Sequence, residues 1–451
     1  MSLDRTLLDP AWSNGHSEVN MSVLKLAEIL RRGRSEKRGS MAIIIAITLP
    51  VLIGFLGLGV DVTNWYLAKR KVQTAVDSGA ISGALTLSYT SDSGAAKKAA
   101  IDSTDRNDFA AGSGNTLEIN IPPISGAYTT DTNAVEVIAT QDQELLLAGV
   151  VFGGTVTVEA RGVATMTIIV GEYCILGLDT EMDQAVEFDG TSDVDVGCGV
   201  AANSHSDQAI SIWGNADLSA TPVSAVGDIS VGGAGVLKTS SPLRSFQYPF
   251  VDPYGAQGKN IAAPYYGGCD ESKLRINNDT TLNPGVYCNG IDIRAGATVE
   301  FNPGMYVIDG GDFLVAGNAT LIGKEVTFFL TGNGNDYATV KFAGGAVANL
   351  SAPTDGPYEG ILFYQDSDAP SFQGATLIKN QFLGGSDMNL TGVLYFPAQD
   401  LVYTGGSTIG STCLQIIARK VTFSGNGAID NNCPPDMVLE SIVSFRVTLV
   451  E

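Results

Sequence analysis

One run of 20 residues constrains this chain more than any other feature. Residues 41–60 read MAIIIAITLPVLIGFLGLGV and carry no charged side chain. At about 1.5 Å per residue, a helix of this length spans about 30 Å, the thickness of the hydrocarbon core of a bilayer. A secretory signal peptide has a shorter apolar region, of about 7–15 residues, close to the N-terminus. We therefore expect residues 41–60 to form a retained transmembrane helix whose partner is the lipid bilayer.

The charges on either side of this run predict its orientation. Six Lys or Arg residues precede it between positions 25 and 38, and three follow it at positions 69–71. Because cytoplasmic flanks carry the excess of positive charge, we expect the N-terminus in the cytoplasm and the rest of the chain on the other side. Residues 1–40 contribute +2 to the net charge of −22, so the exported part carries −24. Phosphate backbones repel such a chain, which argues against nucleic acid as a partner.

The pattern changes from helix to strand after the apolar run. Residues 61–87 continue a helical pattern, and between positions 116 and 166 three segments alternate apolar and polar residues, as strands do. Pro and Gly turns separate these segments. We expect residues 61–170 to form a pilin-like module, with one long helix laid against a small antiparallel sheet. Residues 1–40 are predicted to be a largely disordered cytoplasmic tail.

Candidate contact sites lie along this helix. Ala75, Gly79 and Gly83 recur every four residues and form a stripe of small side chains, which favours packing against another subunit or against the chain's own sheet. Asp61 ends the apolar run, where it either pairs with a basic residue of a partner or lies among lipid headgroups. Asp77, which lies among the small residues, either pairs across an interface or lies at the surface.

Residues 171–433 are a series of short apolar runs separated by Gly, Asn, Asp and Ser. The phrase LNPGVY at 282–287 recurs as FNPGMY at 301–306, a shift of 19 residues. A period near 20 is typical of the coils of a parallel β-helix, which stack about 4.8 Å apart. The predicted fold class is therefore mainly β, with a parallel β-helix after the helix-plus-sheet module and a C-terminal strand or tail over residues 434–451. An irregular β-sandwich is the alternative.

All six cysteines follow the apolar run, and an even number in an exported segment indicates disulfides. Successive cysteines pair off with separations of 24, 19 and 20 residues, which is about one coil. Residues one coil apart in a solenoid lie within reach of a disulfide. The predicted bonds are Cys174–Cys198, Cys269–Cys288 and Cys413–Cys433.

Residues suited to catalysis or metal binding are scarce. The chain has only two histidines, His16 and His205, which leaves little material for histidine metal sites or a Ser-His-Asp triad. Asp193 and Asp195 would share one face of a strand, as a pair of glycosidase carboxylates requires, but a turn with Asx caps followed by a solvated strand is the interpretation that we favour. We expect no enzyme activity, no cofactor and no metal.

A set of features at residues 38–87 resembles the TadE/TadG-like proteins of Tad (Flp) pilus assembly. These features are Arg38-Gly39, Pro50, Val60-Asp61, Trp65-Tyr66, the basic cluster at 69–71, and Gln73, Asp77 and Gly83-Ala84. The region from Cys174 onward is similar to the glycine-rich extension of some TadG-like proteins. The resemblance implies a single-pass protein of the bacterial inner membrane, with its C-terminal domains in the periplasm or at the cell surface. Its implied partners are pilins or other Tad pilus-assembly proteins, and its implied role is structural, in assembly or adhesion.

Two positions depart from related patterns. Asp179–Asp183 lacks the serines of the Asp-x-Ser-x-Ser metal site that many TadG-like proteins carry. Processed pilins have Glu five residues after the cleaved Gly, whereas the fifth residue after Gly39 is Ile44. We therefore expect the helix to keep its tail. The alternative function is a membrane-anchored β-helix that binds or cleaves a surface polysaccharide.

Overall fold

The computed structural model describes residues 39–112, 114–148, 154–256, 258–259, 261, 264, 266–383, 388–404, 413–424, 427–429, 433 and 437–451. The tail predicted over residues 1–40 thus lies almost wholly outside the described residues. The chain divides into two compact units, the first comprising 1–165 with 449–451 and the second 166–448. The structure is mainly β and combines one long apolar helix with a large sheet of parallel strands.

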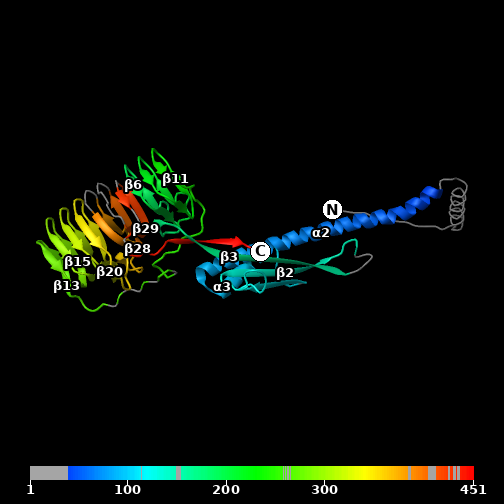
Figure 1. Cartoon of the computed structure of the whole chain (residues 1–451), viewed down its shortest axis with the longest axis horizontal. Coiled ribbons are helices and arrows are strands. Elements are labelled where there is room, and N and C mark those ends of the chain that lie inside the picture. Colours follow the sequence, from blue (N-terminus) through cyan, green and yellow to red (C-terminus); the bar gives the residue numbers. More distant parts are fainter. Residues whose placement is uncertain are drawn as a thin grey trace, which may run out of the picture. The chain divides into compact units, whose positions relative to one another are not determined.

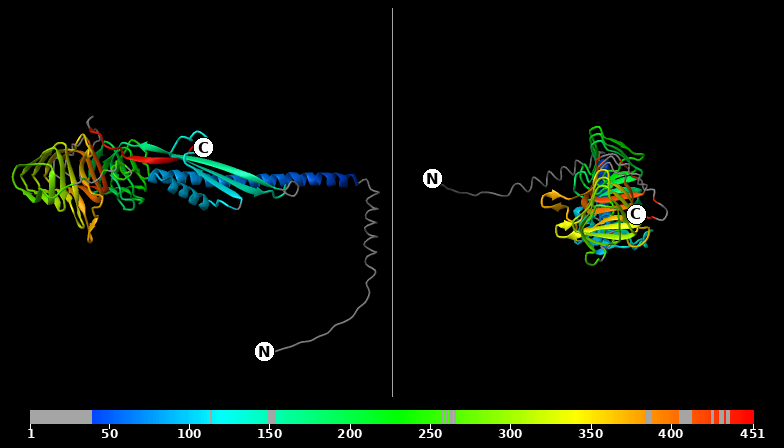
Figure 2. Two further views of the ribbon diagram at one scale, coloured as in Figure 1. Left: turned by 90° about the horizontal axis from the view of Figure 1, so that it is seen from below. Right: turned by 90° about the vertical axis from the view of Figure 1, so that its left-hand side faces the viewer.

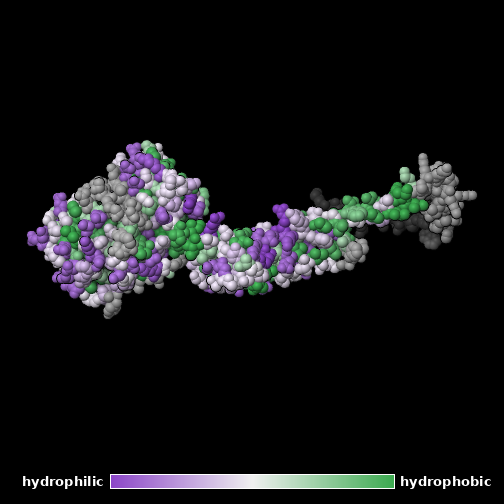
Figure 3. Space-filling model, viewed as in Figure 1, coloured by the Kyte–Doolittle hydropathy of each residue, from purple (hydrophilic) through white to green (hydrophobic). Residues whose placement is uncertain are grey.

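Helix α2 (Gly39–Thr90) is the longest element of the first unit (Figure 1). It is a single helix that continues through Pro50, and it is long and apolar enough to cross a membrane. The apolar side chains of its first half are exposed, which appears as the green stretch of the helix in Figure 3. From Val72 onward one face is buried, because small and branched residues recur there at helical spacing.

A second helix and an antiparallel sheet pack on this buried face. Helix α3 (Ser93–Arg106) begins at Asp92, whose carboxylate accepts the N–H of Gly94 at 2.7 Å as an N-cap. Strand β2 (Ala134–Glu144) pairs antiparallel with β1 (Asn115–Asn120) and with β3 (Thr155–Val170). The sheet order is β1-β2-β3-β31, and β31 spans Val443–Leu449. The division between the two units falls within β3 and β31, close to the predicted boundary at residue 170.

Most strands of the second unit are short and pair in parallel with strands about one repeat away, and two local hairpins pair antiparallel. Gly285 lies opposite Tyr306 and Gly304 lies opposite Val326, which are offsets close to the predicted period. Figure 2 shows these strands side by side in successive layers. The strands are β4 (Tyr173–Gly177), β5 (Val186–Phe188), β6 (Asp193–Val196), β7 (Gly199–Ala202), β8 (Ile210–Ile212), β9 (Asp217–Ser219), β10 (Val223–Ala225), β11 (Ile229–Val231), β12 (Val236–Lys238), β13 (Glu271–Ile276), β14 (Thr280–Leu282), β15 (Gly285–Ile293), β16 (Thr298–Phe301), β17 (Gly304–Asp309), β18 (Asp312–Val315), β19 (Thr320–Gly323), β20 (Val326–Asn333), β21 (Asp336–Tyr337), β22 (Thr339–Phe342), β23 (Val347–Ser351), β24 (Ile361–Gln365), β25 (Phe372–Gln373), β26 (Thr376–Leu377), β27 (Lys379–Phe382), β28 (Met388–Thr404), β29 (Leu414–Ser424) and β30 (Gly427–Ile429).

The order of the strands in space differs from their order in the sequence. One ladder, here called the principal ladder, runs β13, β15, β17, β20, β24, β28, β29, β4, β7, β10. One of its internal links joins β29 to β4, with Ile416 opposite Ile175. The chain therefore enters the stack inside it and not at an end, and then winds outward to β10. After residues 239–270 it resumes at the opposite end and winds back until β29 meets β4.

The strands of the principal ladder are buried on both faces. Phe328 and Phe363 point into one apolar core, whereas the adjacent Phe329 and Tyr364 belong to a second core on the other face of the same sheet. Parallel strands that are buried on both sides read as continuous apolar runs instead of alternating ones, which accounts for the sequence of this region.

The ring of Phe328 lies at the centre of the first core, so its removal should destabilise the second unit. Its centroid is 4.9 Å from that of Phe363 and 5.1 Å from that of Phe313. We expect Phe328→Ala to lower the free energy of unfolding by about 3–5 kcal/mol, measured by urea denaturation of the detergent-solubilised chain. Phe246, which is 76% exposed, provides the control, and Phe246→Ala should leave the midpoint of the urea transition unchanged. Equal midpoints for the two variants would contradict this account of the core.

Candidate functional site

The turn that follows strand β2 lies against α2 at the end of its apolar run. The side chain of Asp61 is 1% exposed and is bound by backbone amides of this turn. Its Oδ1 accepts the N–H of Leu146 at 3.0 Å, and its Oδ2 accepts those of Leu147 at 3.2 Å and Ala148 at 2.6 Å. Hydrogen bonds to a carboxylate are stronger than those between neutral groups. Asp61 therefore fastens the β2–β3 hairpin to the helix, a contact that neither prediction for this residue included.

A glycine allows the hairpin to approach the helix. A Cβ atom added to Gly57 would lie 3.1 Å from the Cβ of Leu147, which is tighter than ordinary van der Waals contact. Leu147 and Ala148 line a groove with helix residues between Leu49 and Leu58, and Leu146 lines a second groove with Phe55 and neighbouring helix residues. The turn thus contacts α2 inside the predicted membrane-spanning run.

The stripe of small residues is covered by the chain's own first unit. Ala75 is fully buried. A Cβ on Gly79 would lie 2.7 Å from Cγ2 of Thr104 in α3, and one on Gly83 would lie 2.9 Å from Cγ1 of Val135 in β2. The two glycines therefore permit α3 and β2 to pack directly on the helix. The contacts of this face are intramolecular, which agrees with the interpretation that the stripe packs against the chain's own sheet.

Asp77 also makes its contacts within the first unit. Its Oδ1 accepts a hydrogen bond from Nε2 of Gln73 at 2.7 Å, and the same Gln73 nitrogen donates to the carbonyl of Arg161 in β3 at 2.8 Å. A Cβ on Gly162 would lie 2.8 Å from Oδ1 of Asp77, so the strand passes close to this side chain. Gln73 and Asp77 therefore link the helix to the sheet.

A buried carboxylate that the sequence did not single out lies on β2. Glu136 is fully buried and its Oε1 accepts a hydrogen bond from Nε of Arg161 at 2.7 Å. Burial alone would raise the pKa of Glu136, but hydrogen bonds from Ile124, Arg161, Asn120 and Ser125 outweigh it and hold the pKa below its ordinary value. The sequence offered one signal for this site: Glu136 is a charged residue within an apolar strand segment.

The structure contains the three predicted disulfides. The Cα atoms are 5.8 Å apart in Cys174–Cys198, 5.6 Å in Cys269–Cys288 and 4.5 Å in Cys413–Cys433. In the first, Cys174 belongs to β4 and Cys198 directly precedes β7, the parallel neighbour of β4. The bond thus joins one layer of the ladder to the next.

The carboxylates considered for polysaccharide chemistry lie on an exposed face of their sheet. Asp193 and Asp195 occupy exposed positions of β6, and Asp193 lies opposite Asp217 of the parallel strand β9. Among the residues that the structure describes, no group of three or more His, Cys, Asp and Glu is placed to hold a metal ion. Nδ1 of His205 contacts the carbonyl oxygen of Thr180 at 2.8 Å.

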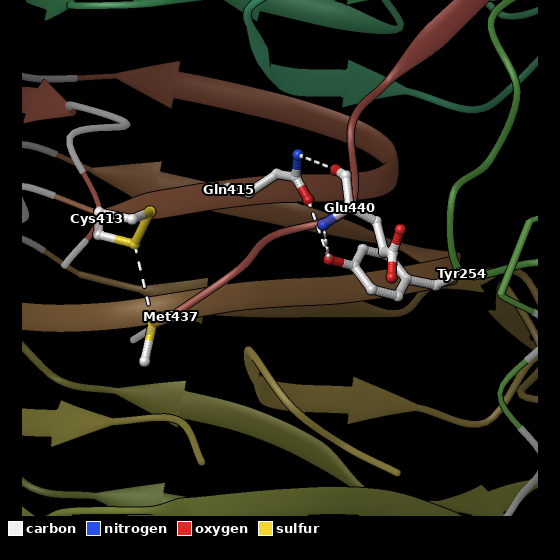
Figure 4. Close-up of a disulfide and its surroundings, with 6 residues drawn as sticks. Tyr254, Cys413, Gln415, Met437 and Glu440 are labelled. Carbon is white, nitrogen blue, oxygen red and sulfur yellow. Dashed lines mark hydrogen bonds between the residues drawn. A yellow bond between two sulfur atoms is a disulfide. The ribbon is translucent and has the colours of Figure 1, made fainter. Parts of the chain in front are cut away.

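The outer face of the principal ladder is covered by two segments, residues 246–256 and 437–442, which we call the strap. Asn203 holds the first segment through two hydrogen bonds to the backbone of Phe250, at 2.7 and 2.9 Å. Tyr254 connects the two segments: its hydroxyl accepts the N–H of Glu440 at 3.1 Å and donates to Oε1 of Gln415 at 3.3 Å (Figure 4). Gln415 in turn donates to the carbonyl of Glu440 at 3.0 Å. The strap removes this sheet face from the surface.

Comparison with known families bears on α2. Residues 39–86 match the model of a family described as putative Flp pilus-assembly TadE/G-like. These residues form a TadE/G-like domain. The match confirms the resemblance predicted for this region, and it contains Asp61 and the stripe at Ala75, Gly79 and Gly83. A search of curated proteins and a search of solved structures give no match.

The close contacts of the stripe predict that bulky residues are rejected there. We expect Gly79→Leu to destabilise the first unit by about 1–3 kcal/mol or more, because the added atoms collide with Thr104 and the backbone of Ala100. Gly59 lies on the same helix with no atom within 4 Å of an added Cβ, and Gly59→Leu serves as the matched control. Thermal unfolding in detergent measures the difference. A melting temperature as low for the control as for Gly79→Leu would count against this packing.

The lowered pKa of Glu136 predicts a loss of stability in acid. The unfolded chain titrates Glu near pH 4.5, and the folded pKa lies below it, so the stabilisation is complete above pH 4.5 and is lost as the pH falls through the folded pKa. Glu136→Gln should lower the free energy of unfolding by about 2 kcal/mol at pH 7, because it weakens the pairing of the buried Glu136 side chain with the partly buried Arg161. The difference between wild type and variant should narrow below pH 4.5, measured by denaturant titration. A difference that is constant with pH would exclude this role for Glu136.

Proposed function

We propose that the chain is a membrane-anchored structural or accessory subunit of Tad (Flp) pilus assembly. The observation that carries this proposal is the TadE/G-like match over residues 39–86, on a helix that is long and apolar enough to cross a membrane. The family description associates this domain with Flp pilus assembly. Pilins or other pilus-assembly proteins are the proposed partners, together with the lipid bilayer.

The proposed location is the inner membrane of a bacterium, crossed once, with the N-terminus in the cytoplasm. The excess of Lys and Arg before the apolar run supports this orientation. Three disulfides in the second unit support an oxidising compartment for it.

We further propose that the second unit is a parallel β-helix that acts as a rigid exported body for assembly or adhesion and does not catalyse a reaction. The offsets near one repeat and the parallel pairing throughout the principal ladder support the β-helix. The strap supports a structural role, because it covers aromatic residues that a sugar-binding face would have to expose: Tyr364 and Tyr395 are each at most 6% exposed.

Deletion of the gene and imaging of pili test the proposal. Pili should be lost on deletion and restored by the wild-type gene. A variant with Leu52→Arg, which places a charge in the apolar run, should fail to restore them because a charge at the bilayer centre is costly. The double variant Asp193→Asn, Asp195→Asn should restore them fully.

The outcome for the two aspartates separates this function from the alternative. Intact pili in the deletion strain, together with loss of polysaccharide binding or of growth on a polysaccharide, would favour the anchored polysaccharide-active protein. Loss of that activity in the double variant would assign it to the exposed face of β6.

A further inference from the structure

We propose that the turn after β2 is a second membrane-contacting element, in which Leu147 lies among the acyl chains of the leaflet on the exported side and Leu146 lies at their boundary. Asp61 is the positioning residue that holds them there. The proposal rests on the proposed membrane anchorage of α2, because it is this helix that fixes the depth of the turn.

The contacts with α2 determine how deep the turn lies. Leu147 contacts Gly57, which precedes Asp61 by four residues, or about 6 Å along the helix. Leu146 lines a groove whose helix residues extend from Phe55 to Leu67 and include Thr63 and Asn64, so it lies level with the end of the apolar run. If the run that ends at residue 60 lies in hydrocarbon, Leu147 lies in it as well and Leu146 lies at its boundary.

The surface formed by the turn and the helix is continuous and apolar. Leu146 is 56% exposed and Leu147 is 47% exposed, and the adjacent Phe55 and Leu56 are both 70% exposed. Contiguous apolar patches of this kind are rare on surfaces that face water and mark contacts with membranes or proteins. We assign this one to lipid because Leu147 and Ala148 share a groove with residues 49–58 of the predicted membrane-spanning run.

The distribution of charge agrees with this depth. Between Glu144 and Glu159 the hairpin sequence has no charged residue, just as α2 has none between residues 41 and 60. Further along the helix, Nζ of Lys69 donates to the carbonyl of Glu159 at 2.5 Å. Lys69 lies eight residues after Asp61, about 12 Å along the helix, where the bilayer interface accommodates charged side chains. Helix and hairpin therefore become charged on the same side of Asp61.

The hydrogen bonds of Asp61 provide partners for backbone N–H groups of the turn, which would otherwise lack them at this depth. In hydrocarbon no water is available to backbone N–H groups, and each group left without a partner costs several kcal/mol. The single carboxylate of Asp61 accepts the amides of Leu146, Leu147 and Ala148. This accounts for an acidic residue at the end of an apolar run whose side chain is almost completely buried.

Fluorescence quenching by lipids tests the proposal in the full chain. The six native cysteines form disulfides, so a single introduced cysteine can be labelled selectively. Leu147→Cys, Leu146→Cys, Leu52→Cys and Ile124→Cys are each labelled with the fluorophore NBD and reconstituted into phosphatidylcholine–phosphatidylglycerol vesicles that contain doxyl-labelled lipids. Leu52 reports the membrane-spanning run, and Ile124, 63% exposed in the same unit, reports the aqueous surface.

We expect the label at position 147 to be quenched as strongly as the label at position 52, the label at position 146 to be quenched as well, and the label at 124 to be unaffected. In the Asp61→Ala background, quenching at 146 and 147 should fall toward that at 124, while quenching at 52 is retained. Asp61→Asn, which keeps one acceptor oxygen, should give an intermediate result.

The controls separate failure of this inference from failure of the proposed function. Quenching at position 52 without quenching at 146 and 147 would leave the anchor in place and overturn the inference. Absence of quenching at position 52 would overturn both. Oxidative cross-linking of Leu147→Cys between chains in place of lipid quenching would assign the surface to a second copy and would also overturn the inference.

Discussion

Helix α2 has to satisfy two environments within one continuous element, and the arrangement of the first unit follows from this constraint. Its first half exposes apolar side chains on every side, whereas its second half has one buried face of small residues. The residues at Gly79 and Gly83 bring α3 and β2 within van der Waals contact of the helix backbone. Asp61 lies between the exposed apolar half of the helix and the half with a buried face, and its carboxylate binds the β2–β3 hairpin at this position.

The second unit depends on a different principle, the burial of both faces of one parallel sheet. The interior face is filled by aromatic rings stacked from layer to layer, such as Phe328 on Phe363. The outer face is closed by the strap, which is attached through side-chain hydrogen bonds of Asn203, Tyr254 and Gln415. Burial of both faces of this sheet thus stabilises the second unit, and neither face is exposed for contacts with other molecules.

Local sequence signals predicted much of this architecture. The uncharged run predicted the apolar helix, and the recurrence of LNPGVY as FNPGMY predicted layers of parallel strands with cysteines one layer apart. The partner of Asp61 could not be predicted, because the amides that it binds are about 85 residues away and carry no side-chain signature. Glu136 was missed for a related reason: its four donors lie on β1, on the loop before β2 and on β3, and they come together only when the sheet forms. The pairing of Ile416 with Ile175 is likewise set by the shapes of two complete layers and not by any local pattern.

That pairing has a consequence for the order of events in the cell. Synthesis from the N-terminus completes strand β4 early and strand β29 late. One edge of β4 therefore has no partner until more than two hundred further residues have been made, because Ile175 pairs with Ile416. A solenoid with its strands in sequence order can add each coil to the one before it, whereas this unit closes only when its last layers have been made. The fold of the second unit therefore cannot be completed on a growing chain that lacks its C-terminal strands.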